Sequence, residues 1–189
     1  MFALKRKLSL IATVLLLVIG TAVQVTASPQ YDLLKAVDEQ DIKEVTTLLA
    51  QGVSPDTRRR SDKVPALLIA VDKSNLALVK LLLDYEANPD IGDPERGETA
   101  LMRRAIAGDV TGVKLLLSYK ADPNRADIGQ ETALIKAVRA RKQRVARVLL
   151  DAGADPNVQD FTGKTALEYA KLSRNRNMVR ILEEAGATY

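Results

Sequence analysis

Apolar residues recur along this chain in short clusters with helical spacing, and polar turns separate the clusters. The stretch 121–157 shows the pattern most plainly. A polar turn at 127–131 precedes one apolar cluster that starts at 133–134, and a basic break at 141–142 precedes a second cluster that ends before Gly153. Apolar residues three and four positions apart share one face of a helix. The pattern therefore predicts a turn followed by two short antiparallel helices.

This unit repeats with a nearly constant period. The tetrad Ala-Asp-Pro-Asn at 121–124 returns at 154–157, which is 33 residues later. The position of Thr132, at which three units have a Thr that should open the first helix, recurs in steps of 34, 34, 33 and 33: Tyr31, Pro65, Thr99, Thr132 and Thr165. Repeats of this length stack, and each unit buries its apolar face against its neighbours. We therefore predict an all-α repeat solenoid of five units, at about 29–62, 63–96, 97–129, 130–162 and 163–189.

Residue types at fixed offsets support these helix boundaries. A Thr hydroxyl at the start of a helix accepts a hydrogen bond from a free backbone N–H of the first turn. Gly at the end of a helix adopts the left-handed conformation at little cost. Glu86 and Lys120 stand where other units have that Gly, and a left-handed conformation there costs roughly 1 kcal/mol each. Ser28 and Pro29 are expected to begin the first helix.

The segments Gly-Lys-Thr-Ala-Leu at 163–167 and Gly-Ala-Asp-Pro-Asn at 153–157 resemble the signature of the ankyrin repeat family. The resemblance covers 29–189 and implies units of two helices joined by β-turn or hairpin loops. It also implies a concave groove, lined by the turns and the first helices, that binds a protein partner. The family's signature His is replaced in every unit. We therefore expect looser turns than is usual for the family.

The resemblance implies which positions are exposed on the turns and first helices. Side chains there are free to differ from unit to unit, because packing does not fix them. The candidate protein-binding residues are Asp38, Glu39, Asp62, Asp72, Lys73, Glu95, Arg96, Glu98, Arg104, Glu131, Arg139, Phe161 and Lys164.

Two of these candidates have competing interpretations. Arg104 occupies a position that is Ala in the other four units. Its stem could lie along the stack with the guanidinium reaching solvent or a carboxylate, or it could be an anchor that faces a partner. Phe161 lies at a turn tip, where it is either a binding hot spot or packs on the neighbouring turn.

The first 27 residues have a different character. Basic residues at 5–7 precede an apolar segment at 8–19, and small residues surround Ala27. This is the layout of a secretory signal peptide. A membrane anchor is the rival interpretation, but a spanning helix needs roughly 20 apolar residues. We therefore expect a cleavable signal peptide at 1–27, a repeat domain at 28–189 and no membrane insertion after cleavage.

Charge and composition narrow the classes of function. Removing the three basic residues at 5–7 from the 28 in the chain leaves 25, against 24 acidic residues. A balance this close to neutral does not favour nucleic acid as a partner. Charge is uneven within the chain: two basic and six acidic residues lie in 28–56, whereas six basic and three acidic residues lie in 130–157. These separate patches could orient a partner.

The chain contains no His and no Cys. Nucleophile systems that depend on His, and metal sites built from imidazole or thiolate, are therefore absent from the sequence. We expect no enzymatic activity, no cofactor and no metal. The missing Cys and the missing Asn-x-Ser/Thr sites fit a bacterial periplasm, with secretion as the alternative.

The expected function is that of a non-catalytic protein-protein interaction module that is monomeric on its own. Small exported bacterial ankyrin proteins suggest two roles by resemblance. One is an immunity protein, or inhibitor, of a toxin that acts in the envelope. The other is a helper of a periplasmic oxidative-stress enzyme such as catalase. A structural envelope adaptor is a third role that the sequence leaves open.

Overall fold

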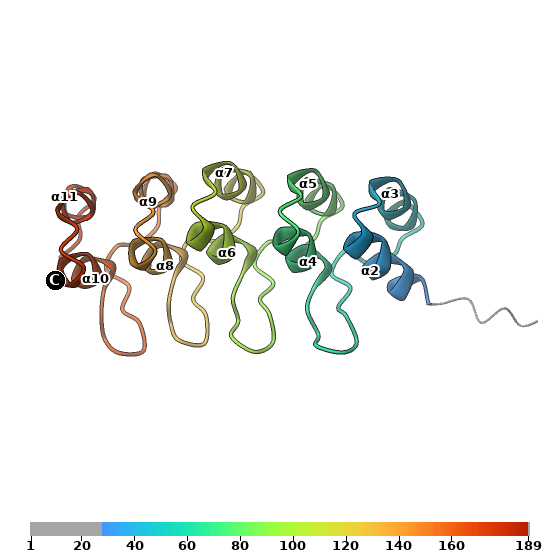
Figure 1. Cartoon of the computed structure of the whole chain (residues 1–189), viewed down its shortest axis with the longest axis horizontal. Coiled ribbons are helices and arrows are strands. Elements are labelled where there is room, and N and C mark those ends of the chain that lie inside the picture. Colours follow the sequence, from blue (N-terminus) through green and yellow to red (C-terminus); the bar gives the residue numbers. More distant parts are fainter. Residues whose placement is uncertain (1–27, 189) are drawn as a thin grey trace, which may run out of the picture.

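The computed structural model describes residues 28–188. Ten helices in this range form five helix–turn–helix pairs, as the sequence predicts: α2 (Pro29–Glu39) with α3 (Ile42–Ala50), α4 (Ala66–Asp72) with α5 (Leu76–Asp84), α6 (Ala100–Ala107) with α7 (Val110–Ser118), α8 (Ala133–Arg139) with α9 (Gln143–Asp151), and α10 (Ala166–Leu172) with α11 (Arg176–Glu184). The pairs stand side by side in one row, which is the arrangement of a repeat solenoid (Figure 1). The expected signal peptide lies outside the described residues.

The helices begin at the capping residues expected from the sequence. The Ser28 hydroxyl accepts a hydrogen bond of 3.3 Å from the amide of Tyr31, and Pro29 is the first helical residue. Thr99 and Thr132 accept bonds of 3.4 Å from the amides three residues later, and Thr165 accepts one of 3.3 Å. Each bond satisfies one N–H that the first turn of a helix leaves without a partner.

The left-handed residues after the second helices also occur where expected. Gly52, Gly153 and Gly186 have φ values of 87°, 89° and 86°. Glu86 and Lys120 take the same conformation, at 66° and 62°. Because an L-residue with a Cβ pays for this conformation, the second and third units accept a small local cost that glycine would avoid.

The core runs without interruption from the first unit to the last. It is built on a leucine that lies two residues after the position of Thr132 in each unit. This leucine is at most 2% exposed in every unit: Leu33, Leu67, Leu101, Leu134 and Leu167. Burying one such side chain contributes about 1.5 to 3 kcal/mol. The alanines of the small-residue position are at most 3% exposed: Ala36, Ala70, Ala137 and Ala170. Small side chains there let neighbouring helices approach closely.

The loops that join successive units all project on the same side. They span about 57–64, 91–98, 125–131 and 158–164, and the first helix of each pair lies between these loops and the second helix (Figure 1). The loops 57–64 and 91–98 each have one residue more than the other two. The amides of Arg59 and Asp93 close them by donating to carbonyls five residues later, whereas the amides of Asp127 and Asp160 donate to carbonyls four residues later.

Candidate interaction surface

The four loops and the five first helices form one continuous surface, called here the loop–helix surface. All thirteen predicted binding residues lie in these elements or in the turns at the ends of the first helices, although one of them, Arg104, is buried. Its geometry depends on how firmly the loops are held, because a loop can present a side chain to a partner only if its own backbone is fixed.

A buried aspartate holds each of the last three loops. Asp93 accepts bonds from the amides of Arg96 at 2.8 Å and Glu95 at 3.0 Å. Asp127 accepts one from the amide of Glu131 at 2.8 Å. Asp160 accepts bonds from two loop amides and from two hydroxyls, one of them the Tyr169 hydroxyl. These carboxylates take over the loop amides that would otherwise lack partners.

The pKa values of two of these aspartates reflect the same bonds. Burial disfavours the charged form of Asp93, but the amides of Arg96 and Glu95 and the Arg103 guanidinium hold its pKa below the ordinary value. Burial also opposes ionisation of Asp160, and hydrogen bonds led by that of the Tyr169 hydroxyl lower its pKa to about 2. Both carboxyls therefore remain charged acceptors for the loops at neutral pH.

Neighbouring loops are also bonded directly to one another. The Ile128 amide donates to the carbonyl of Arg96, and the Phe161 amide donates to that of Gly129, each at 2.8 Å. One side chain after each second helix accepts a bond of 2.7 to 2.9 Å from a backbone amide of the next unit. These acceptors are Asp56, Asp90, Asn124 and Asn157. Aspartates and loop-to-loop bonds thus hold the turns without the signature histidine, and the expectation that these turns are looser than is usual for the family stays a prediction.

Lys136 stands at the centre of a buried ionic cluster. It projects from α8 and is only 9% exposed. Its ammonium lies 2.8 Å from Asp127, 3.0 Å from Glu98 and 3.1 Å from Glu131. These three carboxylates come from the loops of two adjacent units, so one lysine joins both loops to the helix behind them.

The ionic contacts continue in both directions along the surface. Towards the N-terminus, Arg103 of α6 pairs with Asp72 of α4 at 2.5 Å and with Asp93 at 3.3 Å. Towards the C-terminus, Arg139 pairs with Glu131 and lies 5.1 Å from the centre of the Tyr169 ring. Together these pairs form a chain of charges from the second unit to the fifth, called here the ionic row.

Comparison with known proteins agrees with this architecture. Models of ankyrin repeats match residues 33–127, in three copies, and residues 116–170. The chain is a member of the ankyrin repeat family. A search of curated proteins gave no match. Ankyrin repeats are typically non-catalytic modules for protein-protein interaction.

Neither a metal site nor a membrane-spanning helix is found among the described residues. Between residues 28 and 188, no group of three acidic, His or Cys side chains is placed to hold a metal ion. In the same range no helix has the length and apolar character needed to cross a bilayer.

The predicted binding residues fall into distinct groups in this ankyrin stack. Glu95, Arg96 and Phe161 are exposed at loop tips, and no ion pair within residues 28–188 involves them. A second group forms salt bridges within the fold, and its side chains are from 15% to 60% exposed: Asp38, Glu39, Asp62, Asp72, Lys73, Glu98, Glu131 and Arg139. Lys164 is half-buried and donates to the hydroxyl of Thr162.

Arg104 does not lie on the surface. It is 8% exposed, and its guanidinium donates to the carbonyl of Val71 and, at 3.4 Å, to the hydroxyl of Ser74. It also lies 3.5 Å from Asp109. Because its polar groups point into the preceding unit, Arg104 cannot anchor a partner, and we remove it from the candidate set. The idea that it reaches a carboxylate is confirmed by the Asp109 pair.

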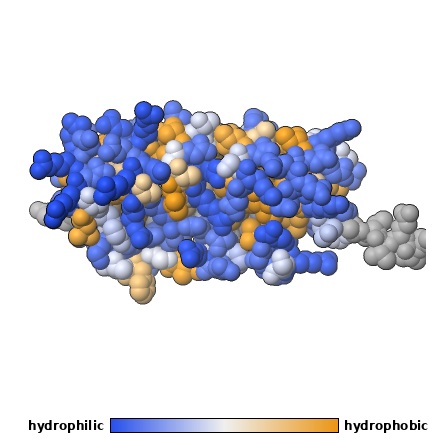
Figure 2. All heavy atoms as spheres, viewed as in Figure 1, coloured by the Kyte–Doolittle hydropathy of each residue, from blue (hydrophilic) through white to orange (hydrophobic). Residues whose placement is uncertain are grey.

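Exposed apolar side chains gather at the C-terminal loop tips. Phe161 is 79% exposed and Ile128 is 68% exposed, and their loops are bonded through the Phe161 amide. Phe161 therefore does not pack on the neighbouring turn. Apolar colour protrudes among hydrophilic spheres at the lower edge of Figure 2, where the C-terminal loops lie. Exposed aromatic and aliphatic groups on a fixed backbone are the composition of a binding hot spot.

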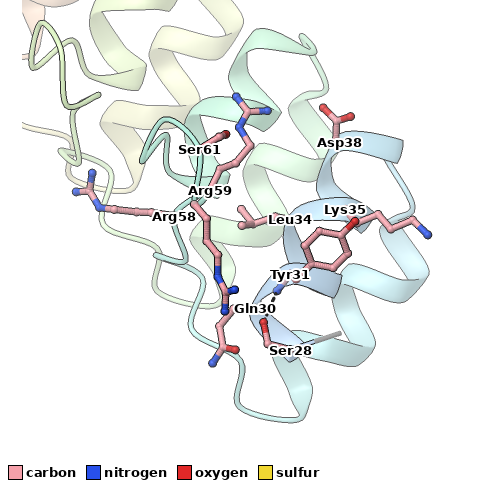
Figure 3. Close-up of a pocket in the computed structure, with 10 residues that line it drawn as sticks. Ser28, Gln30, Tyr31, Leu34, Lys35, Asp38, Arg58, Arg59 and Ser61 are labelled. Atoms are coloured by element: carbon pink, nitrogen blue, oxygen red, sulfur yellow. Dashed lines mark hydrogen bonds between the residues drawn. The ribbon is translucent and has the colours of Figure 1, made fainter. Parts of the chain in front are cut away.

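A concave region lies at the N-terminal end of the stack. It is an open cleft between α2 and the loop 57–64, with Tyr31 and Leu34 on one side and arginines on the other (Figure 3). Arg59 there is bonded to Asp62 at 2.7 Å, which raises the pKa of Arg59. Within the described residues α2 has no loop of a preceding unit beside it, so this cleft is a property of the end of the stack.

Sequence reasoning missed the residues that hold the surface together. Arg103 and Lys136 occupy the same position, four residues after the helix-opening Thr, and each follows three apolar residues at the start of its helix. Asp93, Asp127 and Asp160 recur five or six residues before that Thr. A charged residue at a repeated core-facing position, paired with a recurring Asp in the loop, was the signal that could have identified them.

Proposed function

We propose that this chain acts by binding another protein on its loop–helix surface, without catalysing a reaction. The observation that carries the proposal is the pair of exposed side chains, Ile128 and Phe161, on loops that are fixed by Asp127, Asp160 and a direct amide bond. A rigid apolar pair loses little conformational entropy on binding. Exposed charges of the neighbouring loop, Glu95 and Arg96, supply a polar rim.

We further propose that the protein is exported to the periplasm, with secretion as the alternative, and acts there as an immunity protein or inhibitor of an envelope-acting toxin. A helper of an oxidative-stress enzyme such as catalase, or a structural adaptor, is the competing role. The near-neutral charge after removal of 1–27 argues against nucleic acid. Affinity capture from the native envelope with mass spectrometry separates these roles, since a toxic hydrolase and a catalase are distinct products.

The export proposal predicts a defined N-terminus. N-terminal sequencing of the protein from the envelope fraction should read Ser28-Pro29-Gln30, because small residues surround Ala27 as a signal peptidase requires. Recovery of the intact chain, beginning with Met1, from a cytoplasmic pool would contradict export and the periplasmic roles. It would leave the protein-binding proposal unaffected, since that rests on the loops.

The binding proposal predicts which substitutions weaken partner capture. Phe161→Ala combined with Ile128→Ala should reduce affinity for the captured partner at least about tenfold, since truncating a hot-spot residue costs 2 kcal/mol or more. Because both side chains are exposed, the melting temperature should change little. Partner affinity is measured by calorimetry and folding by circular dichroism. Glu95→Arg, at the rim, should have a smaller effect that weakens as salt increases.

Matched controls lie on the second helices. Lys114→Glu and Arg147→Glu change exposed residues of α7 and α9 and should leave both affinity and stability unchanged. If these substitutions abolish capture while the double alanine variant binds normally, the partner uses the opposite side of the stack. The proposed surface would then be wrong.

A further inference from the structure

The turns between the two helices of each pair form a second edge of the molecule, on which charge is distributed in an unusual way. This edge, called here the turn edge, consists of five equivalent segments: 38–44, 72–78, 106–112, 139–145 and 172–178. Neighbouring segments touch. Asn75 donates to Gln40 at 3.1 Å, Gln143 donates to Asn175 at 3.1 Å, and Arg141 donates to the carbonyl of Ser173 at 3.2 Å.

Net charge changes sign along this edge. Segment 38–44 contains four acidic residues and one lysine, for a net charge of −3, and segment 72–78 is neutral with one of each. Segment 106–112 has only Asp109, which faces Arg104. Segment 139–145 contains four basic residues, for +4, and segment 172–178 contains two, for +2. The turn edge is therefore acidic at one end and basic at the other.

The basic end retains its charge at a structural cost. The residue that precedes the second helix is Asp41, Asn75, Asp109 or Asn175 in four units, and each side chain caps the helix. Lys142 holds that position in the fourth unit and makes no capping bond. Losing such a cap costs about 0.5 to 2 kcal/mol. A positive charge at the N-terminus of a helix also opposes the helix dipole.

A second cost comes from the residue just before the cap. Arg141 and Arg174 adopt left-handed conformations, with φ of 58° and 52°, as Gln40 and Ser74 do in the first two units, whereas the third unit uses Gly108. Within the described residues, Lys142, Arg174 and Arg176 form no ion pair. The deepest hydrophilic colour in Figure 2 lies over this C-terminal end of the stack. Arg174 and Arg176 are exposed and Lys142 is half-buried. Positive charges that are not paired within the fold, one of them in place of a helix cap, point to a contact outside it.

The acidic end and the centre complete the pattern. Glu44 is exposed and unpaired within residues 28–188, Glu39 has only a 4.0 Å contact with Lys35, and Asp38 pairs with Lys73 at 3.0 Å. Between the two ends, Ile106 is 40% exposed. Its neighbour Ala107 is exposed as well. Exposed apolar side chains also lie at both ends of the edge, Ile42 at 41% in the acidic segment and Leu172 at 68% in the basic one. Apolar side chains interspersed with charged ones are the composition of a protein interface.

We propose that the turn edge is a self-complementary interface at which two copies of this chain associate antiparallel, about a two-fold axis through the third unit. In such a contact the acidic first unit of one copy faces the basic fifth unit of the other, and the pairing occurs twice. The second and fourth units face each other, and Ile106 meets its own counterpart at the axis. A second copy of the chain is favoured over a polyanion as the partner, because the same edge carries both an acidic and a basic end together with exposed apolar side chains.

This dimer departs from the monomer expected from the sequence. It leaves the loop tips with Ile128 and Phe161 free, because the loops project beyond the first helices, away from the second helices, and the turn edge lies at the ends of the helices (Figure 1). The turn edge shares Asp38, Glu39, Asp72, Lys73 and Arg139 with the predicted binding residues, but the loop tips lie outside it, so a dimer would present two copies of the loop tips to partners.

Sedimentation velocity of the purified chain over a dilution series, at low and high salt, tests the proposal. We expect a reversible dimer whose dissociation constant rises at least about tenfold between about 0.05 M and about 0.5 M salt, since screening shortens the range of charge pairing. Glu39→Lys with Glu44→Lys should give a monomer, because both ends of the edge become basic. Arg174→Glu with Arg176→Glu should do the same with two acidic ends.

The combination of all four substitutions is the decisive variant. It reverses both ends together, so complementarity returns and the dimer should form again. Ile106→Asp should abolish the dimer and leave the melting temperature of the monomer unchanged. Lys114→Glu with Arg147→Glu is the matched control on the second helices and should dimerise normally.

Three results would overturn the proposal. The first is a chain that stays monomeric at low salt and high concentration. The second is a fourfold variant that remains monomeric, because the two ends would then not face each other. The third is a monomer that binds phosphatidylglycerol vesicles and loses that binding with Arg174→Glu and Arg176→Glu, since the basic end would then serve an anionic bilayer.

Discussion

Replacing Lys136 with methionine is expected to lower the free energy of unfolding by about 3 to 5 kcal/mol, the cost of removing one partner from a buried ionic group. The ammonium lies within 3.1 Å of three carboxylates, and the residue is 9% exposed. Methionine fills a similar volume but leaves Glu98, Asp127 and Glu131 facing one another without their common counter-ion. The loss therefore reports electrostatics rather than a cavity.

Urea unfolding followed by circular dichroism measures this loss. Lys136→Arg keeps the positive charge and should recover much of the stability, although a planar guanidinium fits the three carboxylates less well. Lys114→Met is the matched control, since Lys114 is exposed on α7 and forms no ion pair within the described residues. Its effect should stay within about 0.5 kcal/mol.

A double-mutant cycle separates the proposed cause from a general loss of packing. Adding Asp127→Asn to Lys136→Met removes one of the opposed charges, so the double variant should be more stable than Lys136→Met alone. A Lys136→Met variant that loses less than about 1 kcal/mol would show that the cluster behaves as an exposed ion pair. The ionic row would then not hold the loops.

The fold could be predicted because its determinants are local and repeated. Thr99, Thr132 and Thr165 begin first helices through contacts within a few residues. Gly52, Gly153 and Gly186 likewise follow the ends of second helices. Even the strained Glu86 and Lys120 could be placed, since the repeat fixes their backbone. Periodicity supplied five independent observations of the same unit.

The binding surface could be predicted only in part, because its determinants join residues about 30 positions apart. Lys136 contacts Glu98 of the preceding unit, and Arg103 contacts Asp72. The sequence identified Glu98 and Asp72 as variable and therefore as partner contacts, but their charges are used within the stack. Phe161 needed no long-range contact to be exposed, and the sequence placed it correctly at a loop tip.

Arg104 shows why comparing one repeat position at a time misleads. The third unit has Arg104 where the other four have Ala, and it has Gly112 where three of them have an apolar residue, Leu78, Val145 or Met178. A Cβ on Gly112 would lie 2.9 Å from the Cδ of Arg104 and would also meet the Asp109 carboxylate. The arginine stem therefore fills space that the other units give to a larger side chain on the second helix.

Restoring the family's alanine at this position is accordingly expected to destabilise the protein. Arg104→Ala removes the bonds to Val71 and Ser74 and leaves a void beside Gly112, at a cost of about 2 to 4 kcal/mol. Gly112→Leu alone should cost about 1 to 3 kcal/mol, because the leucine meets the arginine stem.

The double variant Arg104→Ala with Gly112→Leu recreates the combination that Ala70 and Leu78 form in the second unit. It should unfold within about 1 kcal/mol of the unaltered chain, since leucine fills the void and is a better helix former than glycine by roughly 0.8 kcal/mol. Urea unfolding of the four chains gives the coupling free energy between the two positions. Additive losses, with the double variant the least stable of the four, would mean that Arg104 is held by its polar contacts and that the exchange of volume between α6 and α7 does not exist.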